Sequence, residues 1–283
     1  MINETYTLSN GVAIPKIGLG TWMIDGPEAV EAVAQALKLG YRHIDTAQDY
    51  FNEAEVGKAV KASGLAREEV FITTKLSAQH KNYDDAVAAI EKSLSLLDLE
   101  YIDLMIIHCP KPWDQYHDED RHFEGNKAAW KALESFYKAG KIKAIGLSNF
   151  QQVDVDNILD GCEVVPVVNQ ILAHVTNTPQ ALIDYCQSKG ILVEAYSPIG
   201  HGELFKNADI QAMAEKYGVS LAQLCIRYTL QLGLLPLPKT ANPLHMENNA
   251  DVTFVISDED MAVLSQLEKI ADYGDAGVFP VYQ

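Results

Sequence analysis

Four side chains that can transfer protons follow three short apolar segments in the first half of the chain. Asp45 ends the first segment, and Tyr50 lies in the loop after it. Lys75 ends the second segment and His108 the third. The segments have the length and composition of buried strands, and the carboxyl ends of parallel strands meet on one face of an α/β protein. An acid, a phenol, an amine and an imidazole on neighbouring strand ends predict a proton-transfer site.

Strand-like and helix-like segments alternate along the chain. The expected strands are 17–19, 40–44, 70–74, 102–107, 142–147, 164–168, 191–195 and 234–237. The expected helices are 27–39, 53–63, 83–97, 126–138, 153–159, 179–189, 208–217, 221–232, 245–249 and 258–270. Eight such βα units without a linker predict an α/β protein with a single (β/α)8 TIM barrel domain over residues 1–283, with extra helices near the carboxyl terminus.

Two further sequence features bear on the fold. Asn10-Gly11, between short extended segments, predicts a type I′ β-hairpin that covers one end of the barrel. A doubly wound sheet, the competing α/β fold, would need a glycine-rich turn after its first strand. Gly18-Leu19-Gly20-Thr21-Trp22 lacks the third glycine and leads into a loop, so we reject the doubly wound fold.

The composition argues against several classes of function. A formal net charge of −17 disfavours nucleic acid or an anionic membrane as partner. Apolar runs are too short to span a membrane, and residues 1–30 lack the regions of a signal peptide, so a cytoplasmic protein is expected. The four cysteines show neither paired nor metal-ligand spacing, which predicts free thiols and no metal. For Cys109, beside His108, an inert buried thiol is favoured over a redox-reactive one.

Several short motifs resemble those of the aldo-keto reductases of the microbial type, with a short carboxyl-terminal tail. They are Asp45-Thr46-Ala47, Tyr50, Asn52-Glu53, Lys75, His108 with Pro110, Gly146-Leu147-Ser148-Asn149-Phe150, Val168-Asn169-Gln170, Ala195-Tyr196-Ser197-Pro198 and Pro238-Lys239-Thr240. The similarity runs in order from about residue 10 to about residue 265. It implies a (β/α)8 barrel that reduces aldehydes and ketones to alcohols by hydride transfer from NADPH.

The resemblance assigns catalytic roles to the four strand-end residues. Carbonyl reduction needs a hydride at carbon and a proton at the developing alkoxide. Tyr50 would supply the proton; a free phenol has a pKa of about 10, and a nearby Lys75 ammonium is expected to lower it. Asp45 would hold Lys75 in place and charged, and His108 would orient the carbonyl oxygen. Taken singly, the same residues are also compatible with a structural ion pair, a loop tyrosine and a strand-end histidine.

The resemblance also implies a cofactor site. Its residues are Thr21, Ser148, Asn149, Gln170, Tyr196, Ser197, Lys239, Thr240, His245 and Asn249. Ser148, Asn149 and Gln170 would bind the nicotinamide carboxamide, because amides and hydroxyls are suitable partners for it. Tyr196 would stack on the nicotinamide ring, and Ser197 would lie near the pyrophosphate.

At the adenosine end the chain departs from the family pattern. Lys239 and Thr240 match the pair that binds the 2′-phosphate, and Asn249 also matches. His245 stands where most members have an arginine, and Asn248 where many have an acidic residue. Arginine carries a permanent charge, whereas histidine with a pKa near 6.5 is mostly neutral at pH 7. NADPH is expected to stay preferred through Lys239, with NADH also accepted; in the alternative, His245 stacks on the adenine and the preference stays strong.

Aromatic residues are expected to line the substrate pocket, with Trp22 and Trp113 as the candidates. Such a pocket suits small or mid-sized aldehydes and ketones, and the resemblance implies a monomer. Two other functions stay open at this point. One is a non-catalytic, cofactor-binding regulatory subunit on the same barrel. The other is a barrel isomerase or hydrolase that uses the same phenol and imidazole without a nicotinamide.

Overall fold

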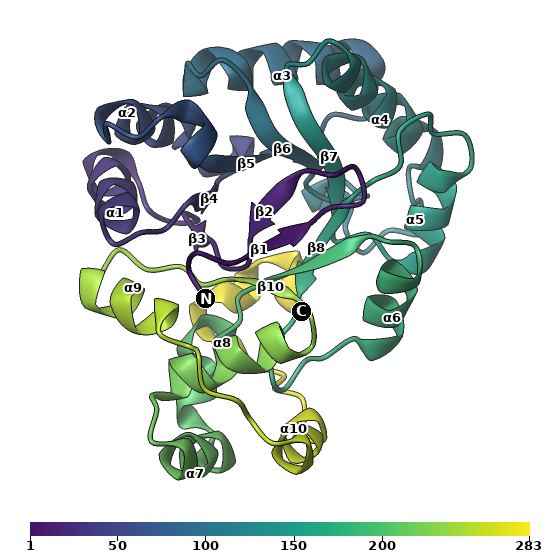
Figure 1. Ribbon diagram of the computed structural model, residues 1–283. Coiled ribbons are helices and arrows are strands. Elements are labelled where there is room, and N and C mark those ends of the chain that lie inside the picture. The colour runs from purple at the N-terminus through teal and green to yellow at the C-terminus, as the bar shows by residue number, and fades with distance from the viewer.

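Eight parallel strands form the centre of the computed structural model, which describes residues 1–283 (Figure 1). They are β3 (Leu19–Gly20), β4 (His43–Asp45), β5 (Phe71–Leu76), β6 (Ile102–Ile107), β7 (Ile142–Ser148), β8 (Val168–Leu172), β9 (Leu192–Tyr196) and β10 (Leu235–Leu237). Neighbouring strands pair in chain order from β3 to β10. The backbone N–H groups of Gly18 and Gly20 donate to the carbonyl oxygens of Pro236 and Pro238 at 3.2 and 3.0 Å, which joins β3 to β10 and closes the barrel.

Helices surround the strands (Figure 1). They are α1 (Gly26–Lys38), α2 (Glu53–Ala62), α3 (Tyr83–Leu97), α4 (Phe123–Lys138), α5 (Gln152–Leu159), α6 (Gln180–Ser188), α7 (Ala208–Tyr217), α8 (Leu221–Gln231), α9 (Pro243–Ala250) and α10 (Asp258–Ser265). One helix connects each strand to the next from β3 to β9, two connect β9 to β10, and α9 and α10 follow the last strand. The predicted (β/α)8 fold is confirmed. No helix has the length and apolar character needed to cross a membrane.

An amino-terminal hairpin of β1 (Thr5–Thr7) and β2 (Ala13–Pro15) lies across one end of the barrel (Figure 1). Ile14 from this hairpin packs with Phe71 and Leu104, which lie near the starts of β5 and β6. The hairpin therefore covers the amino-terminal ends of the strands, as a covering element was expected to do. The carboxyl ends are left to form the functional site.

The turn of the hairpin is not the expected type I′. That turn needs a positive φ at both central residues, and of the pair Asn10-Gly11 only Gly11 has one, at 87°. The Gly11 N–H donates to the Leu8 carbonyl at 2.8 Å, and the Leu8 N–H donates to the Val12 carbonyl at 2.8 Å. The loop is thus longer, and glycine supplies the single left-handed residue in it.

The prediction of a strand at 164–168 was wrong, because β8 begins only at Val168 and continues to Leu172. The N–H groups of Glu163 and Val164 donate to the Glu134 carboxylate on α4 at 2.6 and 2.8 Å, so they are not available to a sheet. Pro166 has no N–H to give. Helix boundaries also moved: α4 begins at residue 123 instead of 126, and α10 ends at 265 instead of 270.

Candidate active site

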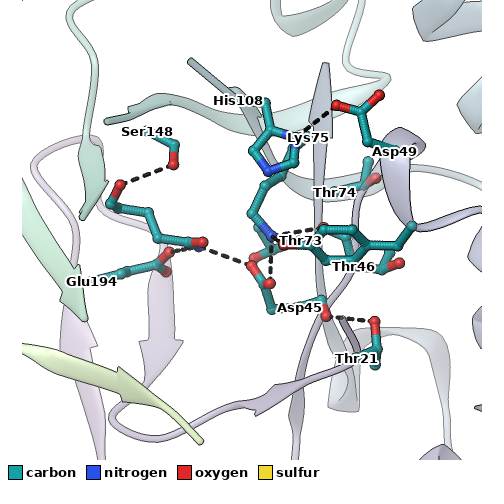
Figure 2. Close-up of polar contacts among 12 residues, drawn as sticks. Thr21, Asp45, Thr46, Asp49, Thr73, Thr74, Lys75, His108, Ser148 and Glu194 are labelled. Carbon is teal, nitrogen blue, oxygen red and sulfur yellow. Dashed lines mark hydrogen bonds and ion pairs between the residues drawn. The ribbon is translucent and has the colours of Figure 1, made fainter. Parts of the chain in front are cut away.

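The four candidate catalytic residues lie together at the carboxyl ends of β4, β5 and β6. Asp45 ends β4, Lys75 is the penultimate residue of β5, and His108 directly follows β6. Tyr50 comes from a single 3-10 turn, Gln48–Tyr50, which follows β4. Because these strands are adjacent in the sheet, the folding of the barrel brings Asp45, Lys75 and His108 to one place (Figure 2). The turn after β4 adds Tyr50, whose hydroxyl contacts the Lys75 ammonium.

Lys75 is the centre of this group. Its side chain is fully buried, and its ammonium forms an ion pair with the Asp45 carboxylate. It also donates to the Thr46 carbonyl at 2.9 Å and to the Tyr50 hydroxyl at 3.2 Å. Three acceptors match the three protons of an ammonium. A lysine without a partner would be costly to bury, so the Asp45 carboxylate is what keeps the charge next to Tyr50.

The expected lowering of the Tyr50 pKa is not seen. Burial raises the pKa of Tyr50 well above its ordinary value, and the nearby carboxylates of Asp45 and Asp49 raise it further. The Lys75 ammonium is shared with Asp45 and does not overcome these effects. Tyr50 therefore stays protonated at neutral pH, and a proton leaves it only for a strong base.

His108 is held by a residue that the sequence analysis missed. Its Nδ1 lies 3.1 Å from Asp49 Oδ2. Burial lowers the pKa of His108, and the hydrogen bond to Asp49 opposes this effect. Asp49 sits in the same turn as Tyr50, and an acidic residue directly beside the candidate phenol was the available signal.

The residues expected at the nicotinamide carboxamide lie on the next two strand ends. Gln170 Nε2 donates to Asp45 Oδ2 at 2.9 Å and to Glu194 Oε2 at 2.7 Å, which uses both hydrogens of its amide. Gln170 Oε1 has no protein partner and is left to accept. Ser148 Oγ donates to the Gln170 backbone carbonyl at 2.9 Å (Figure 2). Asn149, which directly follows β7, has a left-handed φ of 61°.

Glu194 is the second residue that the sequence analysis missed. It is fully buried in β9, and its Oε1 has no hydrogen-bond partner. Burial raises the pKa of Glu194 to about 8, and the neighbouring Asp45 carboxylate adds to the effect. A single glutamate inside the apolar segment 191–195 was the available signal.

Other cofactor candidates extend from this centre across the β3–β10 junction. Thr21 is buried, and its hydroxyl donates to the Asp45 backbone carbonyl at 2.9 Å. The Lys239 side chain is exposed, and its backbone forms an isolated parallel β-bridge with Gly20 of β3. Thr240 Oγ1 accepts from the Asn242 N–H at 3.0 Å, at the start of α9. On α9, His245 is exposed and Asn249 is buried.

The carboxyl-terminal tail packs beside the remaining candidates. Trp22 contacts Phe279 with ring centroids 4.8 Å apart. The Tyr282 hydroxyl lies 3.0 Å from Ser197 Oγ, and its ring meets that of Tyr196 edge-on at 6.3 Å. The tail aromatics thus pack onto the barrel and also border the residues expected to bind the cofactor.

All four cysteines are free, and burial raises the pKa of the Cys109 thiol to about 12, which describes an inert thiol. No group of three or more His, Cys, Asp or Glu side chains is arranged to hold a metal ion.

Comparisons with known proteins agree on one family. The model of the Aldo/keto reductase family matches residues 16–269. The chain is 43% identical over 270 residues to the glyoxal reductase of Bacillus subtilis, a match that covers 95% of this chain and 94% of that protein. It is 38% identical over 311 residues to the aldehyde reductase YPR1 of Saccharomyces cerevisiae, covering 99% of this chain and 97% of that protein.

Solved structures show the same similarity. The Bombyx mori aldo-keto reductase in complex with NADP has a TM-score of 0.86 and 33% identity, and the match covers 100% of this chain and 99% of that one. The aldo/keto reductase of Brucella melitensis has a TM-score of 0.86 and 35% identity, covering 93% of this chain and 98% of that one.

Proposed function

Because the chain belongs to the aldo/keto reductase family, we propose that it reduces small aldehydes and ketones to alcohols with NADPH and with Tyr50 as the proton donor. Membership of the family makes it an oxidoreductase that acts on carbonyl compounds. The observation that carries the finer proposal is the Lys75 ammonium, which bridges the Asp45 carboxylate and the Tyr50 hydroxyl in a buried site. Relatives named as glyoxal and aldehyde reductases support small carbonyl substrates.

In this proposal each residue acts on the carbonyl oxygen or on its neighbour. The nicotinamide, when bound, supplies a hydride to the carbonyl carbon. Tyr50 gives its hydroxyl proton to the oxygen as negative charge develops there. An alkoxide is a stronger base than a phenolate, so the raised pKa of Tyr50 still permits the transfer. Lys75 stabilises the phenolate that remains, and Asp45 balances Lys75 throughout.

The polar residues of the site fit a nicotinamide dinucleotide. Gln170 Oε1 can accept from the carboxamide NH2, because the Gln170 amide nitrogen is already engaged by Asp45 and Glu194. Lys239 is exposed beside the start of α9, and a cation next to a helix amino terminus suits a phosphate. The Bombyx mori relative was crystallised with NADP, which favours the same choice here. NADH as a second accepted cofactor remains part of the proposal, through the histidine at position 245.

We further propose a single-domain monomer in the cytoplasm, as the family resemblance implies. Sedimentation equilibrium of the purified protein measures the first of these directly: a mass near 31.2 kDa is expected, and a multiple of it would contradict the monomer.

The test is NADPH oxidation, followed at 340 nm, with a panel of small aldehydes. We expect aldehyde-dependent oxidation that falls about a hundredfold or more in Tyr50→Phe. Tyr83→Phe, which changes a half-exposed tyrosine on α3, is the matched control and should keep wild-type turnover. Tight NADPH binding without turnover on any carbonyl would instead indicate the regulatory subunit. A lack of both binding and turnover would contradict the proposal and revive an isomerase or hydrolase.

A further inference from the structure

The Asp49 carboxylate gathers two ring N–H groups at the edge of the candidate site. Its Oδ2 lies 3.1 Å from His108 Nδ1 and 2.9 Å from Trp113 Nε1. The indole nitrogen of Trp113 can only donate. One carboxylate oxygen therefore fixes both the candidate carbonyl-orienting residue and a candidate pocket residue.

This contact determines which nitrogen of His108 carries the proton. Burial alone would raise the pKa of Asp49, but the hydrogen bonds from His108 and Trp113 bring it down to about 2. Asp49 is thus an ionised carboxylate that can only accept, so Nδ1 of His108 must donate to it. A neutral ring then carries no proton on Nε2.

An unprotonated Nε2 cannot bind a carbonyl oxygen, because both atoms are acceptors. A doubly protonated ring can, since it donates from Nδ1 to Asp49 and from Nε2 to the substrate. The Asp49 carboxylate favours this imidazolium through charge and hydrogen bonding together. Figure 2 shows Asp49 on one side of the His108 ring, with the dashed contact that joins the two side chains.

We propose that Asp49 is a positioning residue for carbonyl reduction: it fixes the His108 ring through Nδ1, so that His108 engages the carbonyl oxygen from Nε2 as an imidazolium. This inference rests on the proposed function, because it needs a carbonyl substrate at Tyr50. The same oxygen holds Trp113, so the pocket wall and the carbonyl-orienting ring are set by one side chain.

The charged groups around His108 and Asp49 determine whether carbonyl reduction speeds up or slows down as the pH falls. His108 is faced by the charged groups Asp49, Lys75 and Asp45, and its pKa is lowered by burial and by Lys75. The ring of Tyr50 packs edge-on against His108 at 5.7 Å. Reduction should therefore speed up as the pH falls towards the pKa of His108. Because the Asp49 carboxylate opposes the lowering, its loss should move this rise to lower pH.

Further titratable groups also lie near Asp49 on other elements. The Asp49 charge acts on His80, which follows β5, and on Glu53 at the start of α2. The pKa of His80 is lowered mainly by its own burial, and that of Glu53 is raised mainly by its own burial. Neither of the two appears among the groups that act on His108. The Asp49 charge also raises the pKa of Tyr50, but burial is the largest cause there, so Tyr50 stays protonated across this pH range and a change in the profile of the variant is interpreted through His108.

The first experiment reads the tautomer without any catalysis. Nitrogen-15 NMR of the uniformly labelled protein, with neither cofactor nor carbonyl present, is compared with His108→Gln to assign the ring. We expect His108 protonated at Nδ1 in the wild type, and a shift towards protonation at Nε2 in Asp49→Leu. A wild-type ring protonated at Nε2, or no change in Asp49→Leu, would overturn the proposal.

The second experiment measures kcat/KM for aldehyde reduction between pH 5.5 and 8.5. In Asp49→Asn, whose side chain keeps an acceptor but loses the charge, we expect the rise towards acid to move down by about one to two pH units. At pH 6 this corresponds to a loss of about tenfold or more, and Asp49→Glu should restore part of it. Asp114→Asn removes the same charge from the exposed residue next to Trp113 and should leave the profile unchanged.

The outcomes separate this inference from the proposed function. Turnover that depends on Tyr50 but has the same pH profile in Asp49→Asn would overturn the role of Asp49 alone. An equal loss in Trp113→Phe, again with no change in profile, would assign Asp49 to holding Trp113 and also overturn it. No turnover on any carbonyl would overturn the proposed function, and the role of Asp49 with it.

Discussion

Replacing Glu194 by glutamine should stabilise the protein against unfolding at pH 8 and much less at pH 5. The buried carboxyl has a pKa of about 8 in the native protein, against an ordinary value of 4.5. Between these values the native state keeps a proton that the unfolded chain has lost. The contribution of Glu194 to stability is therefore greatest below pH 4.5 and is lost as the pH rises towards 8.

The size of this loss of stability follows from the interval between the two pKa values of Glu194, 4.5 in the unfolded chain and about 8 in the native protein. Each pH unit in it costs the wild type about 1.4 kcal/mol, so about 4 kcal/mol is lost between pH 5 and pH 8. The variant does not titrate and avoids this loss. Its amide oxygen can accept from Gln170 Nε2 as Glu194 Oε2 does, and its amide nitrogen takes the place of Oε1, which has no partner in the wild type either.

The assay is urea unfolding of the two proteins, followed by tryptophan fluorescence at pH 5, 6.5 and 8. The free energy of unfolding of Glu194→Gln minus that of the wild type should rise by about 4 kcal/mol over this range. Glu31→Gln removes the same charge from an exposed position on α1, and its difference from the wild type should stay constant. A constant difference for Glu194→Gln as well would mean that the native protein holds Glu194 ionised, and the reasoning would fail.

Three shorter predictions test the packing, the thiol and the cofactor site. Gly57→Ala should lower the free energy of unfolding, measured by urea denaturation, by about 3 kcal/mol or more, because its Cβ would lie 1.9 Å from the Leu97 carbonyl oxygen. Unchanged stability would refute the close packing of α2 on α3. Cys109 should not react with an aromatic disulfide reagent until the protein is unfolded, and labelling of Cys109 in the native protein would contradict its assignment as an inert thiol. His245→Arg should raise the ratio of kcat/KM for NADPH over NADH by about tenfold, whereas a wild-type ratio already above about a thousandfold would exclude weakened discrimination by His245.

Most of the fold could be predicted because alternating apolar and amphipathic segments impose a parallel sheet. The strand at 164–168 was misplaced for a tertiary reason. Its first N–H groups bind the Glu134 carboxylate, which lies about thirty residues earlier, and no local pattern reveals such a contact. The hairpin turn was predicted from the Asn10-Gly11 pair, but loop length and not the dipeptide decided the geometry.

The candidate site was predicted as far as strand ends alone can define it. Asp45, Lys75 and His108 were found because strand ends in a barrel converge, whatever the loops do. Asp49 and Glu194 were missed because their roles depend on partners from distant strands and loops. Asp49 meets a ring that follows β6, and Glu194 meets an amide on β8. A motif shows which residue types are present, but not which donors will face them.

These two acids show how the same functional group takes opposite charge states in one site. Asp49 receives two ring N–H groups and is held ionised, with its pKa near 2. Glu194 receives a single amide N–H in a fully buried position and is held neutral, with its pKa near 8. If Glu194 were ionised, a second carboxylate would attract the Lys75 ammonium. The hydrogen bond from Lys75 to the Tyr50 hydroxyl would then be weaker. The neutral state of Glu194 leaves Lys75 to Asp45 and Tyr50, and the ionised state of Asp49 supports His108. We therefore expect proton transfer to depend on the contrast between the two acids, and not only on the four residues that the sequence pointed to.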